Sequence, residues 1–250
     1  MRVIVIGDLH AHFVHPMYRR FIHATARAFR TTHTHFVGDI VDSHALSFWD
    51  HDPNGLSAED EAAEALTEVQ KWYQDFPDST VCIGNHDERH YRLARKNGLP
   101  DRYLKSYSDV WRTPRWKWGF EHTLDGVLYE HGTGNSGKDA ALNLAIQKRT
   151  SVVIGHIHSW AGVKWHANPS SVIFGMNAGC GIDCRKYAFA YGRAFPVRPV
   201  LGCGVVIDGE FAAFVAMPCG RGQKYHRSRA EKRPNVGRND QRSDRRKLAA

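Results

Sequence analysis

Five short apolar runs recur along the first 160 residues, and each ends in glycine or in polar side chains. They are rich in β-branched and aromatic residues, which is typical of buried strands. The runs occupy residues 2–7, 35–38, 80–84, 127–131 and 151–155. In open α/β sheets, ligands bind beyond the carboxyl ends of the strands. The pattern therefore predicts that polar residues from distant parts of the chain meet at one edge of a sheet.

Helical periodicity separates the strands. Residues 16–30 and 139–149 have apolar positions at helical spacing, and Ser57 with Asp60 forms a capping box. That box predicts a helix from Ser57 to about Gln74. The alternation predicts an α/β fold of two packed mixed β-sheets flanked by helices.

Two stretches have less regular patterns. From 161 to 216, apolar runs predict further strands, mostly antiparallel, which we expect to complete a second sheet. His33-Thr34-His35 precedes a strand and does not follow one. We therefore expect these two histidines at the strand edge and on the surface.

Length and charge divide the chain in two. We expect one domain over residues 1–220 of the 250, with a candidate cap insert at 88–120. Residues 221–250 hold eleven Lys/Arg and three Asp/Glu, so this stretch accounts for the net charge of +8. It lacks apolar periodicity, and we expect a disordered tail that either aids solubility or attracts nucleic acid. Residues 247–250 also resemble a cloning-vector scar.

The compartment is predicted from apolar runs and cysteines. No run reaches the roughly 18 apolar residues of a membrane span, and the first residues lead directly into a strand without a signal stretch. The five cysteines are an odd number, and Cys180 and Cys184 have no second pair at zinc-site spacing. We therefore expect reduced thiols, a cytoplasmic protein and no membrane partner, and we leave the oligomeric state open.

The candidate cap insert, residues 88–120, combines basic and aromatic side chains. Between Arg89 and Trp118 there are nine Lys/Arg, two Asp/Glu and six interleaved Tyr or Trp. Such a mixture suits a phosphate backbone with unstacked bases. It equally suits amphipathic helices that pack their aromatic residues inward and leave their charges in water. In both cases we expect the insert to cover the site.

The polar residues that follow the five runs form a mixed set of oxygen and nitrogen donors. The set is Asp8, His10, Asp39, Asn85, His131, His156 and His158. It contains no thiolate, and it suits Mn²⁺ first, with Fe, Zn²⁺ or Ni²⁺ as alternatives, in a catalytic site. Seven ligands are too many for one ion in an open site, and suit two divalent ions that share a carboxylate. Two such ions can hold both the attacking and the leaving oxygen of a phosphoryl displacement.

The order of these motifs resembles the calcineurin-like metallophosphoesterase superfamily. The family motifs are DxH, GDxxD, GNH(D/E), a single His before Gly, and GHxH. They match Asp8-Leu9-His10, Gly38 to Asp42, Gly84 to Asp87, His131-Gly132 and Gly155 to His158, in that order. The resemblance covers residues 1–160 and implies a four-layer sandwich, with two sheets between helices.

The resemblance also implies a role for each matched residue. Ligands of the first metal would be Asp8, His10 and His158; those of the second would be Asn85, His131 and His156; Asp39 would bridge the two. A bridging water or hydroxide would attack phosphorus in line. His86 would contact the phosphate and protonate the leaving oxygen, and Asp42 would orient His86 and favour its charged form. Close in sequence, Arg89, His12 and His44 are candidate contacts to substrate.

The second and third motifs depart from those of the Ser/Thr protein phosphatases in the superfamily. Those enzymes continue with Arg-Gly after the second motif and end the third in Glu. Here Ser43-His44 follows the second motif, and Asp87 ends the third. The arginine that would bind the phosphate of a phosphomonoester is therefore missing after the second motif. We therefore expect metal-dependent hydrolysis of a phosphodiester, with DNA or RNA as candidate substrates, and keep a phosphomonoesterase of small molecules or phosphoproteins as the alternative.

Two hypotheses of other classes use the same stretches. Residues 132–139 resemble the glycine-lysine part of a nucleotide-binding P-loop, but Asp139 replaces the Ser/Thr that would bind Mg²⁺. A nucleic-acid-binding protein on an inactive phosphoesterase scaffold would explain the basic insert and tail. Against it, no ligand or catalytic position of the five motifs is lost.

Overall fold

One compact unit, Met1–Met217, carries the fold. The computed structural model describes residues 1–48, 55–183, 185–186 and 198–218. The predicted basic tail at 221–250, its terminal segment 247–250, Cys184 and Cys219 lie outside the described residues. The described Cys82 and Cys203 are free thiols, and Cys180 is buried. None of the described helices is both long and apolar enough to span a membrane.

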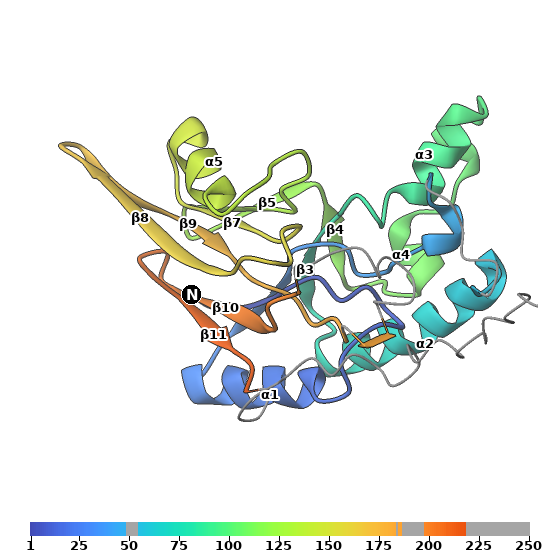
Figure 1. Cartoon of the computed structure of the whole chain (residues 1–250), viewed down its shortest axis with the longest axis horizontal. Coiled ribbons are helices and arrows are strands. Elements are labelled where there is room, and N and C mark those ends of the chain that lie inside the picture. Colours follow the sequence, from blue (N-terminus) through green and yellow to red (C-terminus); the bar gives the residue numbers. More distant parts are fainter. Residues whose placement is uncertain (49–54, 184, 187–197, 219–250) are drawn as a thin grey trace, which may run out of the picture. The chain divides into compact units, whose positions relative to one another are not determined.

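The first sheet has the strand order β11-β10-β1-β2-β3-β4 (Figure 1). Its strands are β1 (Arg2–Ile6), β2 (His33–Phe36), β3 (Ser79–Cys82), β4 (Lys117–Gly119), β10 (Gly202–Ile207) and β11 (Phe211–Ala216). Strands β1 to β4 run parallel, and β10 pairs antiparallel with both β1 and β11. The carboxyl ends of β1, β2 and β3 therefore lie at one edge of the sheet.

The second sheet has the strand order β5-β6-β7-β9-β8. Its strands are β5 (Glu121–Leu124), β6 (Val127–Glu130), β7 (Val152–Ile154), β8 (Gly162–Asn168) and β9 (Ser171–Asn177). Strands β6, β7 and β9 run parallel, and β5 and β8 are antiparallel edges. The prediction for 161–216 holds for β8 and β9. It is wrong for β10 and β11, because β10 pairs with β1 over its whole length and so extends the first sheet.

The core lies between the two sheets. Because side chains alternate across a strand, Val3 and Val5 of β1 share one face. They join a buried cluster that includes Val206 of β10 and, from the second sheet, Tyr129, Val153, Phe174 and Met176. This apolar layer fixes the two sheets face to face.

Helices cover the outer faces. α1 (Tyr18–Phe29) buries Tyr18 and Ile22, and α2 (Ala58–Asp75) buries Trp72, whose ring lies 6.1 Å from that of Phe36 in β2. α5 (Ala140–Lys148) packs its apolar face on the second sheet. The protein is thus an α/β sandwich of two mixed sheets with helices outside, as the sequence predicts (Figure 1). The predicted start of α2 is also confirmed, since Ser57 Oγ accepts the N–H of Asp60 at 3.1 Å.

His35 corrects one expectation. β2 begins at His33, so His35 lies inside the strand and is 0% exposed. Its Nδ1 lies 2.8 Å from Thr80 Oγ1, and its ring centroid lies 4.5 Å from that of Tyr129 in the second sheet. The prediction of a surface position for His35 is wrong, because the strand starts two residues earlier than its apolar run.

The candidate cap insert contains short elements. They are α3 (Arg89–Lys96), a 3₁₀ turn (Asp101–Tyr103), α4 (Tyr107–Trp111) and the edge strand β4. Trp111 and Trp116 are buried. The rings of Tyr91, Tyr107 and Trp118 stack on one another, with centroids 5.0 and 5.4 Å apart. The structure therefore favours inward packing of the aromatic side chains over an open stacking platform.

Candidate metal centre

The seven predicted ligands all follow the carboxyl ends of strands. Asp8 and His10 follow β1, Asp39 follows β2, Asn85 follows β3, His131 follows β6, and His156 and His158 follow β7. Two groups of donors have atoms within 4.8 Å of one another: Asp8, His10, Asp39 and His158, and Asp39, His131 and His156. Asn85 joins the second group, because its Oδ1 lies 3.1 Å from His131 Nε2. The structure therefore brings all seven together, and Asp39 belongs to both groups.

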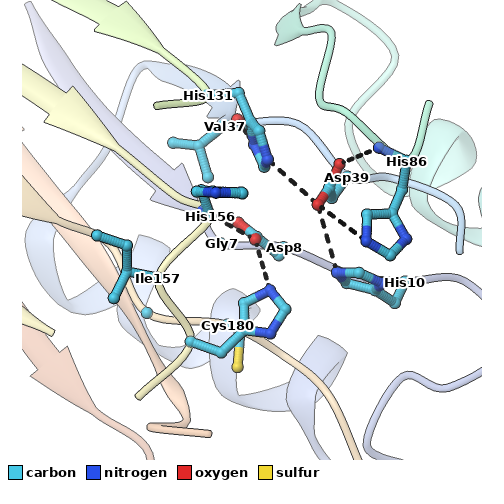
Figure 2. A network of polar contacts seen from close by, with 12 residues as sticks. Gly7, Asp8, His10, Val37, Asp39, His86, His131, His156, Ile157 and Cys180 are labelled. Atoms are coloured by element: carbon cyan, nitrogen blue, oxygen red, sulfur yellow. Dashed lines mark hydrogen bonds and ion pairs between the residues drawn. The ribbon is translucent and has the colours of Figure 1, made fainter. Parts of the chain in front are cut away.

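Asp39 lies where the two sheets meet (Figure 2). Its Oδ1 accepts the backbone N–H of His86 at 2.8 Å. Its Oδ2 lies 3.1 Å from His131 Nε2, 3.5 Å from His10 Nε2 and 4.0 Å from His86 Nε2. One carboxylate oxygen thus faces three imidazoles, which suits a ligand shared by two cations.

Asp8 supplies a direct test of fit for a metal. Its side chain is 0% exposed. Oδ2 accepts the N–H of His156 and lies 2.9 Å from His158 Nε2. Oδ1 is buried without a hydrogen-bond partner among the described residues. A buried carboxylate oxygen without a partner is costly unless a cation neutralises it, so the residues present fit a bound metal.

Hydrogen bonds behind the ligands fix which ring nitrogens face the centre. His131 Nδ1 donates to the carbonyl of Val37 at 2.9 Å, which leaves Nε2 toward Asp39. His10 Nδ1 lies 2.6 Å from Asp42 Oδ1, so its Nε2 also points at Asp39. Such partners set the tautomer and orientation of metal-binding histidines. Asp42 therefore holds His10 as well as His86, a second contact that its place in the motif does not indicate.

Three of the candidate ligands have left-handed backbone conformations. The φ angles are 44° at His10, 48° at Asp39 and 65° at His156. Non-glycine residues with such angles concentrate at functional sites. In an extended segment the side chains of Asp8 and His10 would point to the same side, but the backbone turns at His10, and that turn aims its side chain.

Two glycines leave room for the carboxylates. A Cβ at residue 84 would lie 2.1 Å from Asp39 Oδ1, and a Cβ at residue 155 would lie 2.1 Å from Asp8 Oδ1. Any side chain at Gly84 or Gly155 would therefore displace a candidate ligand.

His86, Asp42 and Arg89 form a second layer beside the donors. His86 Nδ1 lies 2.9 Å from the carbonyl oxygen of Asp42 and 3.1 Å from its Oδ1. Arg89 Nη1 donates to the same carbonyl at 2.7 Å, and its Nη2 lies 3.3 Å from His86 Nε2. The structure thus places Arg89 at the site. Neither His12 nor His44 belongs to a donor group among the residues described.

Burial and neighbouring charges shift the histidines in opposite directions. Burial lowers the pKa of His131, but the Asp39 carboxylate outweighs it and raises the pKa to about 10. His86 has its pKa raised in the same way, against burial, by Asp39 and Asp42. Burial lowers the pKa of His10, and the His86 charge adds to the effect.

Two buried acidic residues at the site are not among the site residues predicted from the sequence. Glu61 of α2 is 4% exposed, and its carboxylate accepts the N–H groups of His44 at 2.6 Å and Ala45 at 2.8 Å. Asp87 is also buried and accepts the N–H groups of Gly84 and Val41. Asp87 lies inside the third motif, whereas Glu61 is one of many acids on a surface helix.

Comparison with known proteins decides the family. The calcineurin-like phosphoesterase family matches residues 1–187, three quarters of the chain. This chain is a calcineurin-like phosphoesterase. The family match includes all five motifs and the whole candidate metal centre. None of the curated proteins matches the chain.

Several solved structures resemble this calcineurin-like phosphoesterase. A metallophosphoesterase from Sphaerobacter thermophilus is 17% identical, covers 87% of this chain and 88% of its own, and has a TM-score of 0.44. Wild-type Vps29 from Entamoeba histolytica, in complex with Zn²⁺, is 14% identical over 85% of this chain and 89% of its own, with a TM-score of 0.42. Vacuolar Protein Sorting 29 from Cryptosporidium parvum is 11% identical over 86% of this chain and 97% of its own, with a TM-score of 0.42.

Proposed function

We propose that this protein hydrolyses a phosphodiester with the help of two divalent cations. The observation that carries the proposal is a pair of donor groups that share Asp39. Within each group, the candidate ligand atoms lie within 4.8 Å of one another. Asp8, His10, Asp39 and His158 would hold one cation, and Asp39, Asn85, His131 and His156 the other. Such cations lower the pKa of a water and neutralise the charge of the phosphate. The oxygen and nitrogen donors suit Mn²⁺, Fe, Zn²⁺ or Ni²⁺.

His86 is the proposed proton donor. With Nδ1 held by Asp42, its Nε2 faces the side of Asp39. The two carboxylates keep the pKa of His86 raised, so the ring can carry a proton. That proton would pass from Nε2 to the leaving oxygen, since an alkoxide is a poor leaving group until it is protonated.

Arg89 is the proposed phosphate contact. An arginine can only donate, so His86 Nε2 is the acceptor in its 3.3 Å contact with Arg89 Nη2. A phosphate oxygen that took over this guanidinium N–H would release Nε2 to hold a proton. Binding of substrate and charging of the acid would thereby be linked.

The arginine found at the site favours a diester over a monoester. A phosphomonoester carries close to two negative charges near neutral pH, and a diester carries one. The position after the second motif holds Ser43-His44, and among the described residues the arginine that contacts His86 is Arg89. The charge of Arg89 beside two cations matches the smaller charge of a diester.

A substrate panel tests the proposal. The purified chain, freed of metal with EDTA, would be assayed with Mn²⁺, Fe²⁺, Zn²⁺ or Ni²⁺ on bis-p-nitrophenyl phosphate and on p-nitrophenyl phosphate. The expected result is metal-dependent turnover with a higher kcat/KM for the diester. A preference for the monoester would replace the proposed activity with that of a phosphomonoesterase. No turnover with any metal would contradict catalysis and favour a binding protein on an inactive scaffold.

A further inference from the structure

Helix α3 leads directly away from the candidate site. Its first residue, Arg89, reaches the carbonyl of Asp42. The helix also packs against the 3₁₀ turn His44–Leu46, which follows the second motif. A ligand that binds along α3 could therefore extend to a phosphate held by Arg89.

α3 has one face toward the protein and one toward solvent. His90, Tyr91 and Ala94 are half-buried, while Arg92, Leu93, Arg95 and Lys96 are exposed. At 100° per residue, Lys96 comes almost directly in line with Arg89, and Arg92 flanks that line. The line from Arg89 to Lys96 is about 10 Å long along the helix axis, at 1.5 Å per residue. A nucleic-acid strand presents more than one phosphate over such a length.

Two positive charges of this helix, those of Arg92 and Lys96, are not neutralised by any acid in the described residues. Arg92 and Lys96 make no ion pair within the described part of the chain. By contrast, Arg95 on the flank of the helix pairs with Asp101 and Glu88. Two of the basic residues are thus left to attract an anion.

An exposed ring lies beside the line. Phe48 is 83% exposed, and Lys96 Nζ lies 5.2 Å from the centroid of its ring. A large exposed aromatic next to a cation is the combination on which an unpaired base stacks while its phosphate is held. Bases in a duplex are already stacked, so this feature selects a single strand.

We infer that Arg92, Lys96 and Phe48 form a binding track for single-stranded nucleic acid. The inference rests on the proposed phosphodiesterase activity and names its substrate class. Arg89 holds the phosphate that is cleaved, and Arg92 and Lys96 contact phosphates further along the strand. Phe48 stacks on a base.

The test compares two double variants of the full-length, metal-loaded protein. Arg92→Gln/Lys96→Gln removes the two unpaired charges of the track. Arg95→Gln/Arg115→Gln removes two charges that are paired with acids, since Arg115 is bound to Asp78. The net charge changes equally, so the second variant controls for long-range attraction. For each, kcat/KM is measured on a fluorescein-labelled twelve-residue oligothymidylate and on bis-p-nitrophenyl phosphate.

The track variant should lower the ratio of the two kcat/KM values, oligonucleotide over small diester, at least tenfold. The slope of log KM against log salt for the oligonucleotide should fall by about 1.4, since each lost phosphate contact removes about 0.7. The control variant should change the ratio less than about twofold. Phe48→Ala should raise KM for the single strand about fivefold or more and leave a duplex unaffected.

Equal ratios in the two double variants would overturn the track. A wild-type protein that cleaves bis-p-nitrophenyl phosphate but not the oligonucleotide would also overturn the track, and that result would leave the proposed function intact. Failure to cleave any diester would instead overturn the proposed function. In that case, fluorescence anisotropy of the same labelled strand tests the track separately by measuring its affinity for the protein. Equal affinities of the wild type and the track variant would exclude the proposed binding track.

Discussion

At the scale of single residues, the centre depends on one oxygen atom. Asp39 Oδ2 is the point toward which histidines from both sheets converge. His86 is close to it but is held by Asp42 as a separate layer. The two residues should therefore differ in what they contribute, metal retention in one case and proton transfer in the other.

Asp39→Asn and His86→Ala should separate these roles. Asparagine keeps the shape but removes the shared negative charge, so bound metal should fall from two ions per chain toward one or none, with turnover lowered about a thousandfold. His86→Ala should lower turnover by about 10²–10⁴-fold, the usual contribution of a general acid, and spare metal content. Metal analysis and steady-state kinetics on the small diester measure both. Equal loss of metal in the two variants would contradict the assigned roles.

His35 makes the stability of the fold depend on pH. Burial lowers its pKa well below 6.5, and the neighbouring His122 and His33 add to the shift. The unfolded chain therefore binds a proton below pH 6.5 that the folded chain does not. The stability contribution of the neutral ring is complete above pH 6.5 and is lost as the pH falls toward the folded pKa.

The difference in the free energy of unfolding between the wild type and His35→Leu should consequently become smaller at acidic pH. At pH 7.5 the variant should be less stable, since Thr80 loses the shorter of its two contacts with histidine nitrogens. Below pH 6.5 the wild type should lose up to about 1.4 kcal/mol per pH unit through His35, and the variant should not. Urea titrations at several pH values give the free energies of unfolding. If this difference in free energy stays constant from pH 7.5 to 5, His35 binds its proton as readily in the folded protein as in the unfolded chain, and its pKa is not lowered.

At the scale of elements, α2 stabilises the segment that carries Asp42. Glu61 accepts two backbone N–H groups directly after the second motif, where Ser43 has a left-handed φ of 50°. Because Asp42 contacts both His10 and His86, a shift of this segment would reach a candidate metal ligand and the proposed proton donor together.

Glu61→Ala should therefore impair both stability and turnover. Two half-buried N–H groups would lose their acceptors, at a cost of at most about 1–3 kcal/mol each. Glu64→Ala, on the exposed face of the same helix, is the matched control and should change the free energy of unfolding by less than about 0.5 kcal/mol. Glu61→Gln keeps one acceptor oxygen and should fall in between. If Glu61→Ala loses stability but keeps its kcat at every pH, the segment does not need Glu61 to position Asp42.

The sequence predicts those elements in which local pattern and tertiary structure agree. The parallel strands with their terminal ligands, and α2 with its Ser57 cap, follow directly from apolar runs and capping residues. It does not predict contacts that only the fold creates. Glu61 resembles its acidic neighbours until the turn at His44 meets it, and β10 has no local sign of which sheet it joins. The left-handed turn at His10 is likewise invisible to strand periodicity.

At the scale of the whole described unit, the donors are divided between the two sheets. Asp8, His10, Asp39 and Asn85 follow strands of the first sheet, and His131, His156 and His158 follow strands of the second. Cations bound between them would connect the sheets in addition to the apolar core.

Metal should therefore raise the melting temperature. At a free metal concentration of about 100 times Kd, one site adds about 2.7 kcal/mol. For a domain of this size that corresponds to about 5–10 °C. Thermal unfolding followed by circular dichroism, with Mn²⁺ and with EDTA, measures the shift. Asp39→Asn should show less than half of it, and an equal shift in this variant would place the stabilising ion elsewhere.

The division of ligands between the sheets also orders events during folding. Neither sheet can assemble a complete coordination sphere by itself, since each donor group combines Asp39 of the first sheet with histidines that follow strands of the second. Tight capture of the ions must wait until the two sheets have docked. Loading with metal would thus be a late step, and the proposed activity would appear in a newly synthesised chain only after the two sheets have packed together.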